Sequence, residues 1–154
     1  MIKILLFSFL TNIFFYSYGH LFKIRNNSKN TNYHNTKSIL GVIIISFIAL
    51  TLNFFLPLEK NLNTFIFFAG LLFLLIKKKF IFSKNEFNYL ILSSIVTSLL
   101  ILYSNVNRPD AGLYHLPYIS ILNEEKILIG SVNLHFRFGH ISSLQYFFSI
   151  FNNI

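Results

Sequence analysis

The cleanest apolar run of the chain reads GVIIISFIALTL, residues 41–52, and this run decides the fold class. It forms the centre of a segment that extends from Ser38 to about Leu58, where Pro57 and Glu59 end it. A helix needs about 20 mostly apolar residues to cross a bilayer. The segment has this length, so we predict a transmembrane helix over residues 38–58.

Three further segments have the same character. We predict an all-α, polytopic transmembrane helix bundle with about four spans, which together occupy residues 1–103. Within the last span, small hydroxylated residues cluster at Ser93, Ser94, Thr97 and Ser98, and such residues suit a contact between helices. The four predicted spans are residues 2–22, 38–58, 62–76 and 87–103.

The composition excludes several classes of protein. Of the 154 residues, 54% are hydrophobic and only 12% are charged, against about 25% charged residues in an average soluble domain. A soluble protein of this length has too much surface to hide that much apolar side chain. The chain has no cysteine, which excludes disulfides and thiolate chemistry.

The formal net charge of +8 indicates orientation in a membrane and not nucleic-acid binding. Residues 23–37 contain four basic side chains, and residues 77–84 contain another four. Both segments are therefore predicted to be cytoplasmic, and the short connection at residues 59–63 external. This alternation predicts that residues 104–139 lie on the outer side of a bacterial inner (plasma) membrane. The lipid bilayer is the predicted principal partner of the chain.

The chain changes character after Tyr103. We predict that residues 104–139 form an external loop with a short helix over residues 113–126 and a turn at Gly130. Residues 140–154 are expected to begin a further helix that the chain cuts short. The chain is accordingly expected to be the N-terminal fragment of a longer protein.

Asp110 is the only aspartate and the predicted catalytic residue. A carboxylate at the membrane–water boundary can orient or deprotonate an acceptor hydroxyl, or bind a metal. The alternative is structural, because a carboxylate at the start of a helix can cap free backbone N–H groups. On a helix, Tyr114 shares the face of Asp110. With the adjacent His115, it is a candidate for substrate binding.

A second cluster of candidate substrate-binding residues contains Asn133, His135 and Arg137. In an extended segment His135 and Arg137 point the same way. Arg can bind phosphate oxygens in a bidentate manner, so the pair suits a phosphate or sugar ligand. The alternative is an interfacial loop that contacts lipid headgroups. The histidines show no zinc-like spacing, and we predict no metal site and no cofactor.

These motifs resemble an uncharacterised family of large bacterial polytopic membrane proteins. The resemblance covers about residues 108–143 and rests on Asp110-Ala-Gly-Leu-Tyr-His, then Asn133-Leu-His-Phe-Arg, then Ser142-Ser143. Pro109, Phe136 and Ile141 depart from that pattern. More distantly, the layout resembles GT-C type glycosyltransferases, which transfer sugar from a polyprenyl-phosphate carrier. That likeness implies a base or metal-orienting role for Asp110 and donor contacts for His115, His135 and Arg137.

Two functional readings follow. The first is a fragment of a GT-C-like glycosyltransferase that uses a polyprenyl-phosphate-linked sugar at the outer face of the membrane. The second is a non-catalytic polytopic protein, either a transporter or an envelope glycan-handling subunit. Ionisable residues within spans favour transport, and the central parts of the predicted spans have none. The fragment by itself is expected to be inactive.

Overall fold

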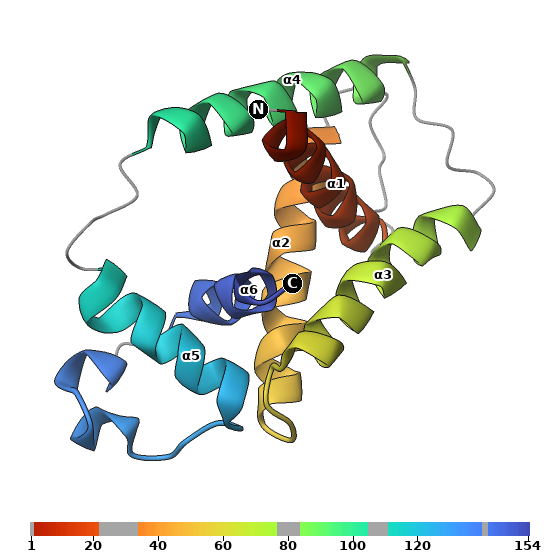
Figure 1. Cartoon of the computed structure of the whole chain (residues 1–154). Helices are drawn as coiled ribbons and strands as arrows, with labels where there is room; N and C mark the ends of the chain where they lie inside the picture. Colours follow the sequence, from red (N-terminus) through yellow and green to blue (C-terminus); the bar gives the residue numbers. More distant parts are fainter. Residues whose placement is uncertain (1, 22–33, 77–83, 105–110, 140–141) are drawn as a thin grey trace. The chain divides into compact units, whose positions relative to one another are not determined.

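The computed structural model describes residues 2–21, 34–76, 84–104, 111–139 and 142–154, and all regular structure in these ranges is helical (Figure 1). The all-α prediction is confirmed. The described part of the chain contains six α-helices, one π-helical turn, η1, and two 3-10 turns, η2 and η3. In chain order they are α1 (Ile2–Gly19), α2 (His34–Asn53), α3 (Lys60–Ile76), α4 (Lys84–Tyr103), η1 (Ala111–His115), α5 (Leu116–Glu124), η2 (Ser131–Asn133), η3 (Phe136–Gly139) and α6 (Ser143–Asn152).

A helix is present in each of the four predicted spans. Two of them, α1 and α4, are long and apolar enough to cross a membrane. The other two predicted spans contain the shorter apolar helices Lys37–Asn53 and Lys60–Leu74. The α2–α3 connection contains Pro57, which fits the end of a helix because proline disfavours helical backbone in the residue before it.

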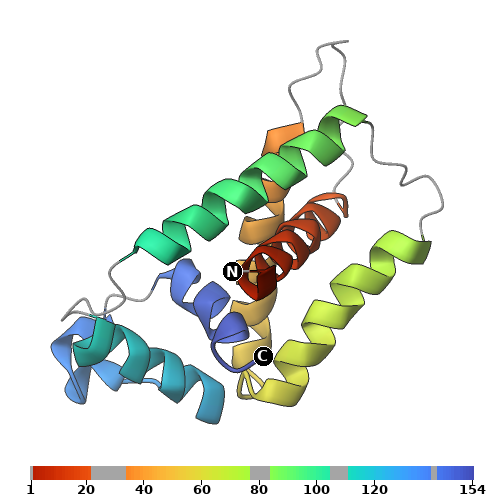
Figure 2. The same cartoon turned by 45° about the horizontal axis from the view of Figure 1, so that its top comes forward.

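The chain divides into two compact units, Met1–Ile44 with Phe67–Ser104, and Ile45–Ile66 with Asn105–Ile154. In the first unit α1 and α4 pack antiparallel (Figure 2), since Ser8 Oγ lies 3.2 Å from Ser98 Oγ and Asn12 Nδ2 donates to Ser94 Oγ at 3.1 Å. Ser94 and Ser98 are buried. The predicted contact role of the serine cluster is therefore confirmed for these two residues.

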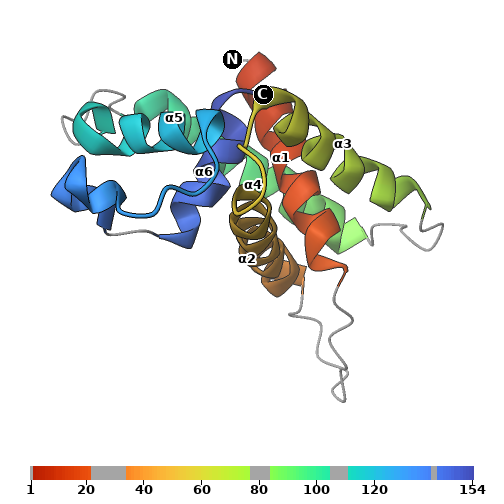
Figure 3. The same cartoon turned by 90° about the horizontal axis from the view of Figure 1, so that it is seen from below.

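The second unit joins the end of α2 and the start of α3 to α5 and α6 (Figure 3). The backbone N–H of Leu58 donates to the carbonyl of Leu122, and that of Ile127 donates to the carbonyl of Asn53, both at 2.9 Å. Leu58, Tyr146 and Ile150 are fully buried. The predicted external segment is thus folded onto the α2–α3 connection.

The last helix, α6, begins with a capping box. The Ser142 hydroxyl accepts from the backbone N–H of Leu144 at 3.3 Å, and the Ser142 N–H donates to Gln145 Oε1 at 3.0 Å. These bonds satisfy N–H groups that have no partner within the helix. The predicted further helix is present, and its first helical residue is Ser143.

Candidate functional site

Two separate stretches of the second unit supply the candidate site. The π-helical turn η1 carries Tyr114 and His115, and the following α5 helix leads away from it. The chain returns after Gly130 and places His135, Phe136 and Arg137 beside Tyr114. The two sequence motifs therefore meet in space.

Local sequence explains both turns. Gly130 has a φ of 86°, a left-handed conformation that side chains disfavour, and the predicted turn at this glycine is confirmed. The predicted helix over 113–126 is divided into η1 and α5 (Leu116–Glu124). Pro117 lies in the first turn of α5 and has no N–H to donate to the preceding turn. A change from π-helical to α-helical bonding at this proline follows from that missing donor.

The Tyr114 ring is the centre of the cluster. The guanidinium carbon of Arg137 lies 4.5 Å from the ring centroid. The His135 ring is nearly parallel to the Tyr114 ring, with 6.5 Å between centroids, and the His115 ring centroid lies at 4.3 Å. Beside these groups is an open pocket of about 430 Å³, lined by Tyr114, His115, Phe136, Arg137 and Gln145.

His135 and Arg137 do not lie in an extended segment, the arrangement in which their side chains would point the same way. Arg137 belongs to the 3-10 turn η3, and its backbone N–H donates to His135 Nδ1 at 3.3 Å. Because Nδ1 accepts this bond, a neutral His135 carries its proton on Nε2. The local bond holds the imidazole against the turn, yet both side chains still reach Tyr114.

The His135 ring packs against the buried Phe138, which in turn packs against the buried Tyr118. The ring centroid of Phe138 lies 5.3 Å from that of His135 and 5.3 Å from that of Tyr118. Burial raises the pKa of the Tyr118 phenol, and the nearby Tyr146 raises it further. Tyr118 is therefore a neutral packing residue at physiological pH.

One candidate residue lies apart from this cluster, and another cannot be placed because it lies outside the described residues. Asn133 ends the 3-10 turn η2, is exposed and does not line the pocket. Asp110 lies outside the described residues, immediately before the first residue of η1. Among the described residues, no group of three His, Cys, Asp or Glu side chains is placed to hold a metal ion.

The structure adds Gln145 and Phe136 to the residues identified from sequence. Gln145 reaches the pocket from the first turn of α6, where it also completes the capping box. The pattern Ser142-x-x-Gln145 before an apolar run is a sequence signal for that position. No sequence pattern indicated that Phe136 lines a pocket, because a phenylalanine in this chain can equally well face lipid or pack in the core.

The site combines one guanidinium, two imidazoles and an amide around an aromatic ring. Guanidinium and imidazole N–H groups are donors, and the guanidinium holds a permanent positive charge. An aromatic face offers a surface for the apolar side of a sugar ring. This arrangement can bind an anionic or polyhydroxylated ligand.

The fold and site define an all-helical protein with two helices of membrane-spanning length and a separate cationic, aromatic pocket. The chain belongs to the family described as a domain of unknown function, DUF8201, whose match covers residues 1–154. No curated protein and no solved structure matches the chain.

Proposed function

We propose that the chain is part of a membrane-embedded glycosyltransferase of the GT-C kind, whose motif pocket binds the phosphate-linked sugar of a polyprenyl donor. The observation that carries this proposal is the convergence of Arg137, His115 and His135 around Tyr114. These residues come from two motifs about twenty positions apart. His115 and Arg137 line one pocket with Tyr114, and His135 stacks on the Tyr114 ring beside it, which supports a common ligand.

The distribution of polar and apolar side chains supports a membrane setting. In α4 the buried residues are Glu86, Leu90, Ser94 and Ser98, whereas apolar residues such as Leu100 are exposed. Only 22% of the apolar window of α4 is buried, and 33% of that of α1. An apolar core helix of a soluble protein is mostly buried, so exposed apolar faces of this kind are better suited to lipid.

The grouping of helix ends supports the predicted orientation. Tyr16, Lys37 and Glu86 are predicted to lie at the cytoplasmic ends of α1, α2 and α4, and they meet in the first unit. Asn53 and Leu58 are predicted to lie at the outer side, and they bond to the α5 region in the second unit. Within each unit, the helix ends that contact one another through these residues are ones that alternation assigns to the same side.

In the proposed reaction, an acceptor hydroxyl attacks the anomeric carbon of the donor sugar. The bond from that carbon to the phosphate oxygen breaks, and polyprenyl phosphate leaves. Arg137 neutralises the charge on the leaving phosphate, and the histidines donate hydrogen bonds to its oxygens or to sugar hydroxyls. Asp110 takes the proton of the acceptor hydroxyl.

Binding of polyprenyl phosphate to the protein in nanodiscs tests the pocket. Charge-assisted hydrogen bonds are worth about 1.5–3 kcal/mol, so Arg137→Ala should raise the Kd by about 10- to 100-fold. Arg137→Lys should give an intermediate Kd, because lysine keeps the charge but cannot bind two oxygens at once. Lys126→Ala is the matched control, since Lys126 is an exposed cation of the same unit.

An equal Kd for Arg137→Ala and Lys126→Ala would show that the pocket does not bind polyprenyl phosphate. Transfer from polyprenyl-phosphate monosaccharides is measured separately with Asp110→Asn. This variant should bind donor normally and lose transfer by at least about 100-fold, the lower end of the usual range for a general base. Intact transfer in Asp110→Asn would show that Asp110 is not the base. Donor binding with no transfer by the complete wild-type protein, of which this chain is proposed to be a part, would favour the non-catalytic, glycan-handling alternative.

A further inference from the structure

A second cavity lies within the first unit and takes no part in the proposed transfer. It has a volume of about 540 Å³ and is lined mainly by α1 and α4, with Ser38 from α2. One part of its lining is polar and includes Asn12, Tyr16 and Glu86. Another part is apolar and includes Leu92 and Val96. A cavity of this composition fits an amphiphile.

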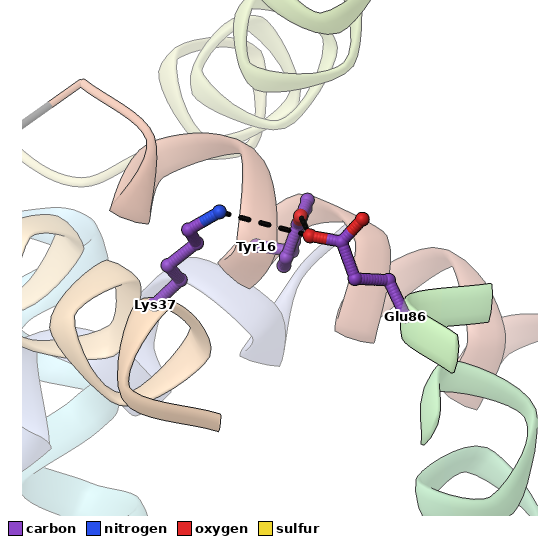
Figure 4. Close-up of polar contacts among 3 residues, drawn as sticks. All are labelled: Tyr16, Lys37 and Glu86. Atoms are coloured by element: carbon purple, nitrogen blue, oxygen red, sulfur yellow. Dashed lines mark hydrogen bonds and ion pairs between the residues drawn. The ribbon is translucent and has the colours of Figure 1, made fainter. Parts of the chain in front are cut away.

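The carboxylate of Glu86 is the charged group of this cavity. Only 8% of the Glu86 residue is exposed. Its Oε1 accepts a hydrogen bond from the Tyr16 hydroxyl at 2.5 Å and lies 3.7 Å from Lys37 Nζ (Figure 4). Lys37 Nζ also lies 5.4 Å from the centroid of the Tyr16 ring. The Glu86 carboxylate lines the cavity, and the Lys37 ammonium, from another helix, lies next to that carboxylate.

The uncharged polar groups of the lining present acceptors. The Ser93 hydroxyl donates to the Leu90 carbonyl at 3.0 Å, and the Thr97 hydroxyl donates to the Ser93 carbonyl at 2.8 Å. Asn12 donates its amide N–H to Ser94 Oγ. Since the protons of the two hydroxyls are engaged, their oxygens remain as acceptors. With the Glu86 carboxylate, these atoms suit a ligand that carries N–H donors.

We infer that this cavity binds the headgroup of an aminophospholipid of the phosphatidylethanolamine type. The ammonium of the headgroup binds Glu86 and the acceptor oxygens, its phosphate pairs with Lys37, and an acyl chain lies along Leu92 and Val96. The separation of opposite charges in the headgroup matches the neighbouring carboxylate and ammonium of the protein. Phosphatidylcholine has both charges but no N–H donors, and phosphatidylglycerol has no cation, so neither lipid offers both the charge pair and the N–H donors.

The position of the charged pair along the helices agrees with this ligand. Lys37 lies near the start of α2 and Glu86 in the first turn of α4. Both adjoin the basic segments 23–37 and 77–84, which charge asymmetry assigns to the cytoplasmic side. The cavity then lies at the headgroup level of the inner leaflet. The inference shares the membrane setting with the proposed function and is independent of glycosyl transfer.

Lipid retention in mixed nanodiscs tests the inference. The protein is reconstituted in equal parts of phosphatidylethanolamine, phosphatidylcholine and phosphatidylglycerol, extracted gently, and examined by native mass spectrometry. Wild-type protein should retain phosphatidylethanolamine in preference to the other two lipids. Glu86→Gln should reduce this preference by about tenfold, since it removes a charge-assisted bond. Glu59→Gln, at an exposed acid of the α2–α3 connection, should retain it.

A second measurement guards against loss of folding in Glu86→Gln. Val96 and Leu100 are both exposed, but only Val96 lines the cavity. A photoreactive residue at Val96 should therefore crosslink phosphatidylethanolamine in preference to the other two lipids, whereas one at Leu100 should crosslink all three lipids equally. Unselective crosslinking at Val96, or retention of the preference in Glu86→Gln, would overturn the inference. Preferred retention of phosphatidylglycerol would also overturn it. Polyprenyl phosphate binding should be unchanged in Glu86→Gln, which separates this result from a failure of the proposed function.

Discussion

Buried asparagines hold the second unit together at the level of single residues. Asn53 Nδ2 donates to the carbonyls of Leu122 and Glu125, at 3.2 and 3.0 Å. Asn63 Nδ2 donates to the carbonyls of Leu58 and Ser149, at 2.6 and 3.1 Å. Both asparagines are fully buried. Their amide N–H groups therefore supply the hydrogen bonds that water would supply to exposed carbonyl groups.

Replacing Asn53 by alanine should destabilise this unit. The change removes donors from buried carbonyls, and each such loss costs about 1–3 kcal/mol. Asn61→Ala, in the exposed first turn of α3, should leave the melting temperature nearly unchanged. Thermal unfolding in detergent, followed by far-UV circular dichroism because the chain has no tryptophan, compares the two variants. Equal melting temperatures would show that Asn53 does not hold the unit together.

Part of the candidate site could be predicted from the sequence, but the role of these asparagines could not. Tyr114, His115, His135 and Arg137 were identifiable because ionisable and aromatic residues are concentrated in two short motifs. Asn53 lies near the end of the span predicted over residues 38–58, four residues before Pro57, and no feature of the neighbouring sequence marks it as a packing residue. Its partners are about 70 positions away, and nothing in the local pattern indicates such a distant contact.

At the level of helices, two glycines allow a close crossing of α1 and α2. A Cβ atom at Gly19 would collide with the backbone carbonyl of Lys37, and one at Gly41 with the backbone carbonyl of Phe15. Backbone atoms cannot move aside as a flexible side chain can. Small residues of this kind are characteristic of helix contacts in membranes.

Gly41→Ala should therefore weaken the contact between α1 and α2. Overpacking typically costs about 1–3 kcal/mol, which exceeds the gain of about 1 kcal/mol in helix propensity over most of that range. Gly112→Ala is the matched control, because a Cβ there meets nothing within 4 Å. Thermal unfolding should show a lower melting temperature for Gly41→Ala alone. A melting temperature at or above that of the wild type would contradict the close crossing.

The positions of the helices were predictable from apolar length, but their ends were less so. The span predicted from residue 87 is a helix that begins at Lys84 and includes Glu86 in its first turn. A buried carboxylate is unfavourable in isolation, which is why the sequence favoured a later start. The bond from Tyr16 and the ion pair with Lys37 compensate for that burial. Both partners are distant in sequence, so the compensation could not be predicted from local pattern.

At the level of the whole molecule, the contact between α1 and α4 is polar, and large apolar residues of both helices are exposed. Ser8 and Asn12 of α1 face Ser98 and Ser94 of α4, whereas large apolar residues such as Leu100 remain exposed. The central claim is that the helices cross a membrane and that the pocket around Tyr114 faces its outer side.

Site-specific labelling of single cysteines tests this claim most directly. The chain has no cysteine of its own, and Ile129 is fully exposed in the segment predicted to be external. Ile129→Cys should react with a membrane-impermeant maleimide in intact spheroplasts. Asn85→Cys, exposed in the first turn of α4, should react only after lysis. Labelling of Ile129→Cys only after lysis would place the pocket in the cytoplasm and contradict the account.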